Sequence, residues 1–498
     1  MARFKSTRRT VLQGLASGTV VGALGSLQSG SAFGGSHSKE STASIAGLTG
    51  NVVRRGDENY ETWRQSLIWH KDKPHRYPDM IVQALSVDDV KRTVKYAAEN
   101  KLKISMRSGG HNATGAALRD SGIALDLSNL AGIAIDAGSQ IARVQPGAIS
   151  IALTSDAAAQ GFAFPTPHCP TVGMGGFLMG GGIGWNYTHR GGFSCLSIEG
   201  AEIVTADGEL VMATRDENPD LYWAVRGAGP GFFGVVTRFH LKIYPLPQGI
   251  LSSSYILPLE EVETMTTAMD ALDASRDDRL EVLCALMHNP AAAPDAQGGD
   301  AKICFVSAYA FGNSVAESRD MLKPLADSAI AKKAITKAEY EAFSLPELYR
   351  FFLPDSPAGA HARYACDSIM TDELSAAVVA AAEHFPSTPS PLNHVLAGYG
   401  MNLRHRDDSC LSSIAKHYLG TFIIWQDEAD DERNETWLDE SLPLTDPFAK
   451  GHYVSEVEVA RHPEHIVECF SVENWQRLNA LRTKYDPDGV FHNYLGYS

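Results

Sequence analysis

The chain has 498 residues, of which 44% are hydrophobic and 20% are charged, and its formal net charge is −16. This length exceeds what one hydrophobic core usually serves, so the sequence predicts more than one lobe. An acidic chain without a long basic run repels phosphate backbones, which argues against nucleic acid as a partner.

The first 35 residues form a separate segment. Arg8 and Arg9 precede a mildly apolar run, rich in glycine and alanine, that is too short and too weakly apolar to span a bilayer. This order is typical of a twin-arginine signal, with a candidate cleavage site at Gly30-Ser31-Ala32. The alternative is a tail with an accidental arginine pair. We expect residues 1–35 to be a signal peptide. The twin-arginine machinery of a bacterium would export the protein to the periplasm or out of the cell, and we expect no membrane span.

Regular elements follow in chain order up to about residue 247. Residues 86–102 predict a helix, in which Ser86 caps the first turn, Asp89 is the acidic partner, and Val90, Val94 and Ala97 share an apolar stripe. The other predicted elements are strands at 103–108, 122–130 and 141–148, a helix at 149–161, and a hairpin at 198–211 that turns at Ala206-Asp207-Gly208. Residues 218–247 predict a helix, a glycine-rich turn and a long strand.

Pro245-Leu246-Pro247 marks a boundary, after which the glycine-rich motifs stop. The elements predicted beyond it are strands at 252–259, 280–288 and 302–312, helices at 313–329 and 372–385, and a final helix capped by Ser471 and stopped at 486–489. This order predicts an α+β lobe with an antiparallel sheet.

Seven cysteines are spread along the chain without a C-x-x-C pair: Cys169, Cys195, Cys284, Cys304, Cys366, Cys410 and Cys469. An odd number in a long chain does not suggest a disulfide framework. We expect most of them to be buried as small apolar side chains, and at least one thiol to have another role.

Two glycine-rich loops, at residues 105–115 and 165–185, carry the chemistry of the sequence. Successive bare backbone N–H groups can form a nest for phosphate oxygens. The dinucleotide fingerprint G-x-G-x-x-G fails, because its sixth position from Gly173 is Leu178 and from Gly180 is Trp185. A P-loop fails too, since no Gly-Lys-Ser/Thr occurs in these loops. A pyrophosphate can still bind here, but not in those two folds.

His111 lies in the first loop and Cys169 in the second. Each alone is most simply a hydrogen-bonded histidine or a buried thiol. At loop tips that approach a ligand, however, both are nucleophiles able to attack an electron-poor ring such as an oxidised flavin. Two ligands are too few for a metal site, and no H-E-x-x-H occurs, so we expect no metal.

Five segments in this order resemble the berberine bridge enzyme-like flavoproteins, members of the vanillyl-alcohol oxidase superfamily with the FAD-binding fold of p-cresol methylhydroxylase (PCMH). They are RSGGHNATG (107–115), HCPTVGMGGFLMGGGIGW (168–185), EIVTADGELV (202–211), residues 218–245 and KYDPDGVF (484–491). The resemblance implies an α+β fold, with a PCMH-type FAD-binding domain at 36–247 and an α+β substrate-binding domain with an antiparallel sheet at 248–455. Residues 456–498 would return to the FAD domain.

The resemblance also implies how FAD is held. His111 matches the histidine that bonds the flavin 8α-methyl group, and Cys169 matches the cysteine that bonds flavin carbon 6 in doubly linked members. The other cofactor-binding residues implied are Arg107, Ser108, Gly109, Gly110, Asn112 and Gly115 in the first loop, Gly173, Gly175, Gly176, Gly180 and Gly181 along the flavin, and Val204 near the adenine. Val172 matches a gate position, where a small side chain leaves room for dioxygen, although valine is also a common core residue.

The catalytic base is where this sequence departs from the family. Many relatives have the pattern Y-x-N-Y late in the substrate lobe, and here residues 453–456 read Tyr-Val-Ser-Glu. Tyr453 or Glu456 is therefore the candidate base, and a glutamate serves if burial raises its pKa. In a strand these two residues point to opposite faces, so we expect only one to face the flavin, and Glu456 and Glu458 to share a face.

The sequence thus predicts an FAD-dependent oxidase that takes a hydride from a substrate alcohol, a sugar or a secondary metabolite, and passes electrons to dioxygen to give hydrogen peroxide. A dehydrogenase with another acceptor and an inactive secreted binding protein remain alternatives. His417, Tyr399 and Asn402 could contact substrate, although an ordinary sheet position is the better explanation for each of them.

Overall fold

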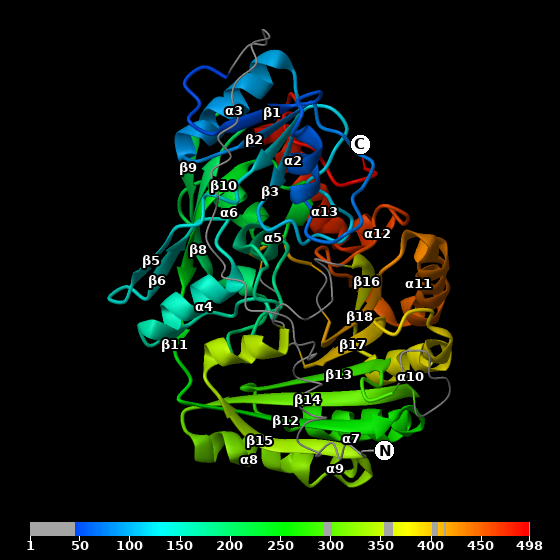
Figure 1. Cartoon of the computed structure of the whole chain (residues 1–498). Coiled ribbons are helices and arrows are strands. Elements are labelled where there is room, and N and C mark those ends of the chain that lie inside the picture. Colours follow the sequence, from blue (N-terminus) through cyan, green and yellow to red (C-terminus); the bar gives the residue numbers. More distant parts are fainter. Residues whose placement is uncertain (1–44, 293–300, 353–361, 401–406, 413–414, 498) are drawn as a thin grey trace, which may run out of the picture.

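The computed structural model describes residues 45–292, 301–352, 362–400, 407–412 and 415–497. The expected signal peptide, residues 1–35, lies outside the described residues. Figure 1 shows two layered parts, with small sheets and helices of the first half at one end and a broad sheet at the other.

A small sheet begins the chain, with strand order β1-β2-β4-β3. Its strands are β1 (Asn51–Arg54), β2 (Met80–Gln83), β3 (Ile104–Arg107) and β4 (Ile123–Asp126), and its helices are α2 (Tyr60–Ser66) and α3 (Val87–Asn100). β2 and β3 both run parallel to β4, which requires the α3 crossover between them. The first glycine loop leaves the end of β3 at Arg107, so this sheet sets its direction.

A second sheet of five strands follows, in the order β5-β6-β10-β8-β9. It contains β5 (Ile133–Asp136), β6 (Ile141–Val144), β8 (Ile198–Val204), β9 (Leu210–Ala213) and β10 (Val235–Lys242), with a short pair β7 (Phe162–Ala163) and β11 (Tyr244–Pro245) beside it. The helices of this region are α4 (Ser150–Ala159), α5 (Met174–Met179) and α6 (Pro219–Val225). The second glycine loop lies between β7 and β8 and contains α5.

Local capping signals locate several helix ends. The Ser86 side chain accepts a hydrogen bond from the Asp89 N–H, and the Asp89 carboxylate accepts from the Ser86 N–H, which is the predicted capping box. Ser471 caps α13 (Val472–Tyr485) in the same way through the Asn474 N–H. These predictions are confirmed because caps depend on residues three positions apart.

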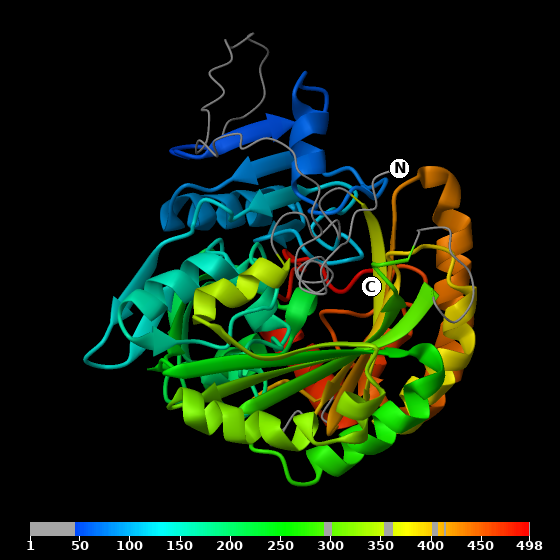
Figure 2. The same cartoon turned by 60° about the horizontal axis from the view of Figure 1, so that its bottom comes forward.

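The broad sheet has eight antiparallel strands in the order β15-β12-β14-β13-β17-β18-β16-β19. They are β12 (Gly249–Pro258), β13 (Leu280–His288), β14 (Lys302–Gly312), β15 (Thr336–Phe343), β16 (Arg363–Thr371), β17 (His394–Tyr399), β18 (His417–Trp425) and β19 (Ala449–His452). Helices α7 (Val262–Asp273), α8 (Val315–Ala326), α9 (Ala329–Lys333), α10 (Leu374–His384) and α11 (Asp431–Thr445) cover its outer face (Figure 2). The predicted α+β fold with an antiparallel substrate sheet is confirmed.

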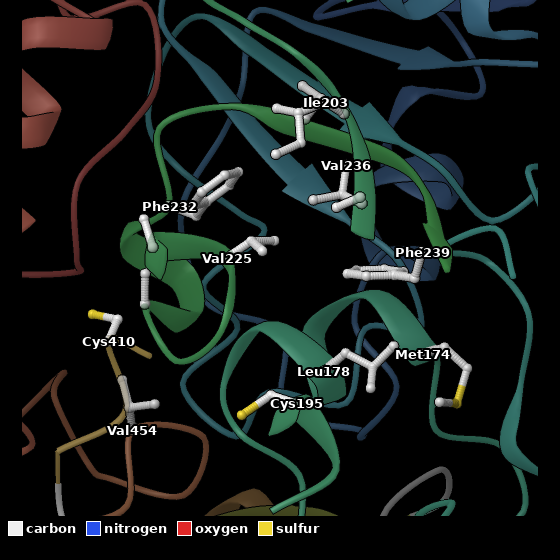
Figure 3. Close-up of a cluster of buried hydrophobic side chains, with 14 of the residues drawn as sticks. Met174, Leu178, Cys195, Ile203, Val225, Phe232, Val236, Phe239, Cys410 and Val454 are labelled. Atoms are coloured by element: carbon white, nitrogen blue, oxygen red, sulfur yellow. The ribbon is translucent and has the colours of Figure 1, made fainter. Parts of the chain in front are cut away.

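The α5 helix is fixed to the five-stranded sheet through one face. Met174 and Leu178, four residues apart, are fully buried and point toward Val236 and Phe239 of β10 (Figure 3). Each such side chain contributes about 1.5–3 kcal/mol by leaving water. The glycines of α5 are thereby presented on its other face.

The last residues return to the first half of the molecule. After α12 (His465–Glu468) and α13, the Ile104 N–H donates to the Val490 carbonyl at 2.7 Å, and the Tyr494 hydroxyl donates to the Ala228 carbonyl at 2.5 Å. In Figure 1 the red α13 lies beside the green and blue elements of the N-terminal part. The C-terminal segment therefore supports β3, from which the first glycine loop leaves.

Candidate active site

A cavity of about 820 Å³ lies between the two glycine loops and the inner face of the broad sheet. Its floor comes from the first half of the chain and its roof from the second. Because opposite walls come from distant segments, neither half of the sequence contains a complete site.

The two glycine loops touch through their backbones. A Cβ atom on Gly109 would lie 2.4 Å from the Gly173 nitrogen, and one on Gly173 would lie 2.5 Å from the Gly109 nitrogen. Ser108 holds them together, since its hydroxyl donates to the Pro146 carbonyl and accepts from the Gly175 N–H at 3.3 Å. Side chains at Gly109 and Gly173 would separate the loops, which explains the bare sequence at this point.

His111 and Cys169 meet at one hydroxyl on the cavity wall. Thr171 Oγ1 lies 3.1 Å from His111 Nε2 and 3.6 Å from Cys169 Sγ. The imidazole is stacked on Trp69, with ring centroids 4.1 Å apart. Burial, aided by the positive charge of Arg107, lowers the pKa of His111 to about 3. The imidazole is therefore neutral at neutral pH and keeps a nucleophilic lone pair.

The structure brings most of the sequence-predicted cofactor residues to this cavity. Those that line it are Arg107, Ser108, Gly109, Gly110, His111, Asn112, Cys169, Val172, Gly173, Gly175 and Gly176. Four do not: Gly115, Gly180, Gly181 and Val204. Gly180 is packed against Ser455, Gly181 adopts a φ of +114° beside Phe193, Gly115 adopts a φ of +61° beside Pro74, and Val204 is buried in β8. These four are packed against other parts of the protein and do not line the cavity.

Three side chains on the cavity wall have a buried polar atom without a hydrogen-bond partner among the described residues. They are Arg107 Nε, Tyr187 Oη and His492 Nε2. A buried polar group without a partner is costly, so such atoms indicate a bound ligand with its own polar groups. Together with the bare loops and the stacked His111, these donors fit a large ligand with a flat ring and a phosphate part, as FAD is.

The roof of the cavity is one face of the broad sheet. Its lining residues are Leu283 from β13, Tyr364 and Cys366 from β16, His394, Leu396 and Gly398 from β17, and Tyr418, Phe422 and Ile424 from β18. Side chains alternate between the faces of a strand, so the intervening residues point to the helices outside. Tyr399 is one of these and packs in the outer core. His417 accepts from the Gly400 N–H away from the cavity, and Asn402 lies outside the described residues.

Tyr453 and Glu456 both line the cavity, which corrects the expectation that only one would. The reason is that β19 ends at His452, and residues 453–456 form a turn in which the Glu456 N–H donates to the Tyr453 carbonyl at 2.8 Å. The expected shared face of Glu456 and Glu458 is also wrong. Glu458 is buried outside the cavity lining, where its side chain accepts from the Ala460 N–H.

The two candidate bases have different surroundings. Tyr453 Oη accepts a hydrogen bond from the Gly182 N–H at 2.9 Å, and burial raises its pKa. Glu456 Oε2 accepts one from the Tyr418 hydroxyl at 2.5 Å. Burial raises the pKa of Glu456, although the bond from Tyr418 and the nearby His168 act in the opposite direction. Glu456 is thus a carboxylate that is shielded from solvent and that accepts a hydrogen bond from the Tyr418 hydroxyl.

Comparisons with known proteins agree with this site. A family model described as "FAD binding domain" matches residues 78–214. The FAD-linked oxidoreductase janO of Penicillium janthinellum is 28% identical over 435 residues, covering 86% of this chain and 93% of that protein. (R)-6-Hydroxynicotine oxidase of Paenarthrobacter nicotinovorans is 39% identical over 233 residues, 46% of this chain and 50% of that protein. The crystal structure of 6-hydroxy-D-nicotine oxidase from Arthrobacter nicotinovorans superposes with a TM-score of 0.78 at 25% identity, covering 91% of this chain and 99% of that one.

The chain is an FAD-dependent oxidoreductase, and it resembles the berberine bridge enzyme-like flavoproteins. The moss protein "Physcomitrella patens BBE-like 1" shares the fold, with a TM-score of 0.77 at 18% identity over 90% of this chain and 97% of that one. The FAD-binding domain matched at residues 78–214 makes FAD the cofactor of this chain, and the cavity between the glycine loops fits the flat ring and the phosphate part of FAD. In the part of this oxidoreductase that the structure describes, no helix has the length and apolar character needed to cross a membrane.

Some lining residues of this oxidoreductase were not predicted from the sequence. Trp69 precedes both glycine loops, and Tyr418 lies in a strand without a motif. His168, beside Cys169, forms an ion pair with buried Glu281 at 2.6 Å between Nε2 and Oε1, and Glu281 also accepts from the Asn186 N–H at 2.8 Å. Of these residues, only His168 could have been singled out from the sequence, because it is the sole side chain with a titratable nitrogen in residues 165–185.

Proposed function

We propose that this flavoprotein is an exported oxidase that holds FAD through two covalent bonds, one to His111 and one to Cys169, and that oxidises an alcohol. The substrate is a sugar or a secondary metabolite, and dioxygen is reduced to hydrogen peroxide. Bound FAD supplies the hydride acceptor, at flavin N5, and the route by which electrons reach dioxygen.

The observation that carries the double attachment is the position of the two nucleophiles. His111 Nε2 and Cys169 Sγ lie within 3.1 and 3.6 Å of the same Thr171 hydroxyl, on two loops that are fixed to each other at Gly109 and Gly173. A single flat ring placed against that wall meets both side chains. The neutral state of His111 supports its role as a nucleophile.

The proton of the substrate hydroxyl goes to Glu456 in this proposal. The carboxylate faces the cavity, and burial raises its pKa toward the range in which a general base is effective. The Tyr418 hydroxyl, which donates to Oε2, orients the carboxylate so that Oε1 is presented to the substrate. Tyr453 is the weaker candidate, because its raised pKa keeps its proton in place and its oxygen already accepts from Gly182.

Two observations support dioxygen as the acceptor, and a third supports export. Val172 lines the cavity between the two loops, where its small side chain leaves space for dioxygen. A relative, (R)-6-hydroxynicotine oxidase, is an oxidase by name. Export rests on Arg8 and Arg9 with the apolar run that follows them.

The test begins with protein from a flavin-replete host. After acid precipitation, the yellow colour should stay with the protein, and peptide mapping should find the FAD mass on one crosslinked species containing both His111 and Cys169. A screen of alcohols, sugars and phenols should then give peroxide with stoichiometric uptake of oxygen. Colour released into the supernatant would refute the attachment, and flavin reduction without oxygen uptake would show a dehydrogenase instead.

A further inference from the structure

A buried group of three side chains lies behind the turn that carries Glu456. We call Asp367, His452 and His465 the Asp367 cluster. Asp367 is on β16 next to Cys366, so its side chain points away from the cavity that Cys366 lines. All three residues are buried, with Asp367 only 2% exposed. A carboxylate in this position needs several donors to offset its loss of water.

The donors come from the two histidines and from the backbone. Asp367 Oδ1 lies 3.2 Å from His452 Nδ1, and Oδ2 lies 3.2 Å from His465 Nδ1. Oδ2 also accepts from the Glu458 N–H at 3.0 Å. The next residue, Ser368, donates from its hydroxyl to the Glu456 carbonyl at 2.8 Å. Two adjacent residues of β16 therefore hold the backbone of the turn on both sides of residue 457.

The groups around His452 favour the doubly protonated, cationic form of its ring. Nδ1 faces the Asp367 carboxylate and, at 2.9 Å, the Ser368 carbonyl, while Nε2 lies 3.2 Å from Glu468 Oε2. Each of these neighbours is an acceptor, so both ring nitrogens carry hydrogens and the ring is a cation. In agreement, burial lowers the pKa of His452, but the bond to Asp367 and the negative charges of Asp367, Asp446 and Glu468 together raise it above the ordinary value. Burial likewise opposes ionisation of Asp367, and the bonds from the two histidines nevertheless hold its pKa at about 2.

The cluster does not have the geometry of a metal site. The rings of His452 and His465 are stacked, with centroids 4.3 Å apart and planes inclined by 16°. In-plane lone pairs of two nearly parallel rings do not converge on one ion at about 2.1 Å from each nitrogen. Carboxylate-to-imidazolium hydrogen bonding explains the arrangement instead.

We propose that Asp367 is a positioning residue: with the His452 cation it clamps the turn at residues 453–458 and so aims Glu456 at the substrate. The inference rests on the proposed role of Glu456 as base. Asp367 itself touches neither substrate nor cofactor. Charge-assisted hydrogen bonds are stronger than neutral ones, so the clamp is firm while His452 is charged.

The clamp is therefore sensitive to pH. The titratable groups that face the two histidines are Asp367, Glu468, Asp446, His462, Glu464 and Cys469, with the two histidines facing each other. A histidine whose pKa is raised in the folded state stabilises that state below its unfolded pKa and loses this contribution as pH rises through the folded value. The turn is held most firmly at mildly acidic pH and loosens as the pH becomes alkaline.

The test is site-resolved amide hydrogen exchange of the flavin-loaded protein, reported as protection factors between roughly pH 6 and pH 9. In the wild type, protection of the Glu458 amide should fall as pH rises. Asp367→Asn should lower that protection about tenfold or more at pH 6 and leave the central residues of β18 protected. A residue with a merely structural role would expose β16 and β18 as well. Asp439→Asn is the matched control, because Asp439 pairs with His462 without touching the turn.

A second variant keeps the test informative if Asp367→Asn does not fold. His452→Asn keeps a side-chain N–H donor but cannot titrate, so protection of Glu458 should vary less steeply with pH. The remaining variation should come from His465, whose pKa is also raised by Asp367 against the effect of burial. Wild-type protection in Asp367→Asn, or an unchanged pH slope in His452→Asn, would overturn the clamp. Glu456→Gln separates the two proposals, since it should slow flavin reduction at least about 100-fold while Glu458 stays protected. If Glu456→Gln reduces flavin at nearly the wild-type rate, the proposed base is wrong, and the exchange data still test the clamp.

Discussion

The Tyr418 hydroxyl donates a 2.5 Å hydrogen bond to Glu456 Oε2, joining the start of β18 to the turn after β19 across 38 residues of sequence. Both side chains line the cavity. The pair places a carboxylate with a defined orientation beside the space where substrate and flavin meet. It is the centre of the chemistry that we propose.

Replacing Glu456 by glutamine should slow the chemical step, because the amide cannot accept the substrate proton. A positioned base contributes about 100- to 10,000-fold, so we expect a loss of at least about 100-fold in the rate of anaerobic flavin reduction. Stopped-flow bleaching of the flavin absorbance measures this rate. Glu458→Gln, a buried glutamate off the cavity lining, should lose far less, and equal losses would remove Glu456 from its role.

The Tyr418 hydroxyl should set the acid limb of the pH profile. Glu456 must be ionised to act, so the rate falls as pH drops through its pKa, which burial raises above the ordinary value. The bond from Tyr418 lowers that pKa, so Tyr418→Phe should move the limb to higher pH. The measurement is kcat/KM against pH. Tyr364→Phe, which also lines the roof, should leave the limb in place, and an unmoved limb in Tyr418→Phe would contradict the prediction.

The two attachment points should be separable by mutation. His111→Ala and Cys169→Ser should each keep flavin bound to acid-precipitated protein through the remaining bond, and the double variant should release it. In-gel flavin fluorescence and intact mass report the linkage. Cys366→Ser, whose thiol also lines the cavity, is the control and should change nothing. Free flavin from either single variant would mean that only one covalent bond exists.

Alanine substitutions at two glycines should have different effects, one on stability and the other on FAD binding. Gly109→Ala drives a Cβ into the Gly173 backbone, so it should destabilise the loops by an amount typical of overpacking, about 1–3 kcal/mol, and lower the melting temperature of the apoprotein. Gly176→Ala meets nothing within 4 Å but faces the cavity. It should fold normally and bind less FAD. A normal melting temperature for Gly109→Ala would show that the loop contact is dispensable.

Val172 should control the second half of the reaction. Val172→Ile fills space on the cavity wall, so the rate at which reduced flavin is reoxidised by dioxygen should fall. The anaerobic rate of flavin reduction in the same variant is the internal reference and should stay near that of the wild type. A parallel loss in both rates would indicate distortion of the site and not a narrower oxygen path.

Features that depend on neighbouring residues were predictable from the sequence. The Ser86 cap, the hairpin of β8 and β9 and the bare loops around His111 and Cys169 are examples. Their determinants lie within a few residues of one another, so local chemistry decides them. The cavity-lining position of both His111 and Cys169 followed from the loops in the same way.

Features that depend on distant contacts were not predictable. Residues 452–459 read as a strand by propensity, yet Asp367 and Ser368, almost 90 residues earlier, bind the backbone at Glu456 and Glu458 and fold it into a turn. The partner of Glu456, Tyr418, carries no motif at all. Gly180 and Gly181 resemble ligand-binding glycines, but they pack against Ser455 and Phe193, which only the tertiary fold brings near.

The separate origin of floor and roof has a consequence for how this scaffold can diversify. Roof positions such as Leu396, Gly398 and Phe422 alternate with residues that serve the outer core, so each can be exchanged without disturbing the loops that grip the cofactor. New substrate preferences can therefore arise by single replacements along three neighbouring strands, while the redox machinery beneath them is inherited unchanged.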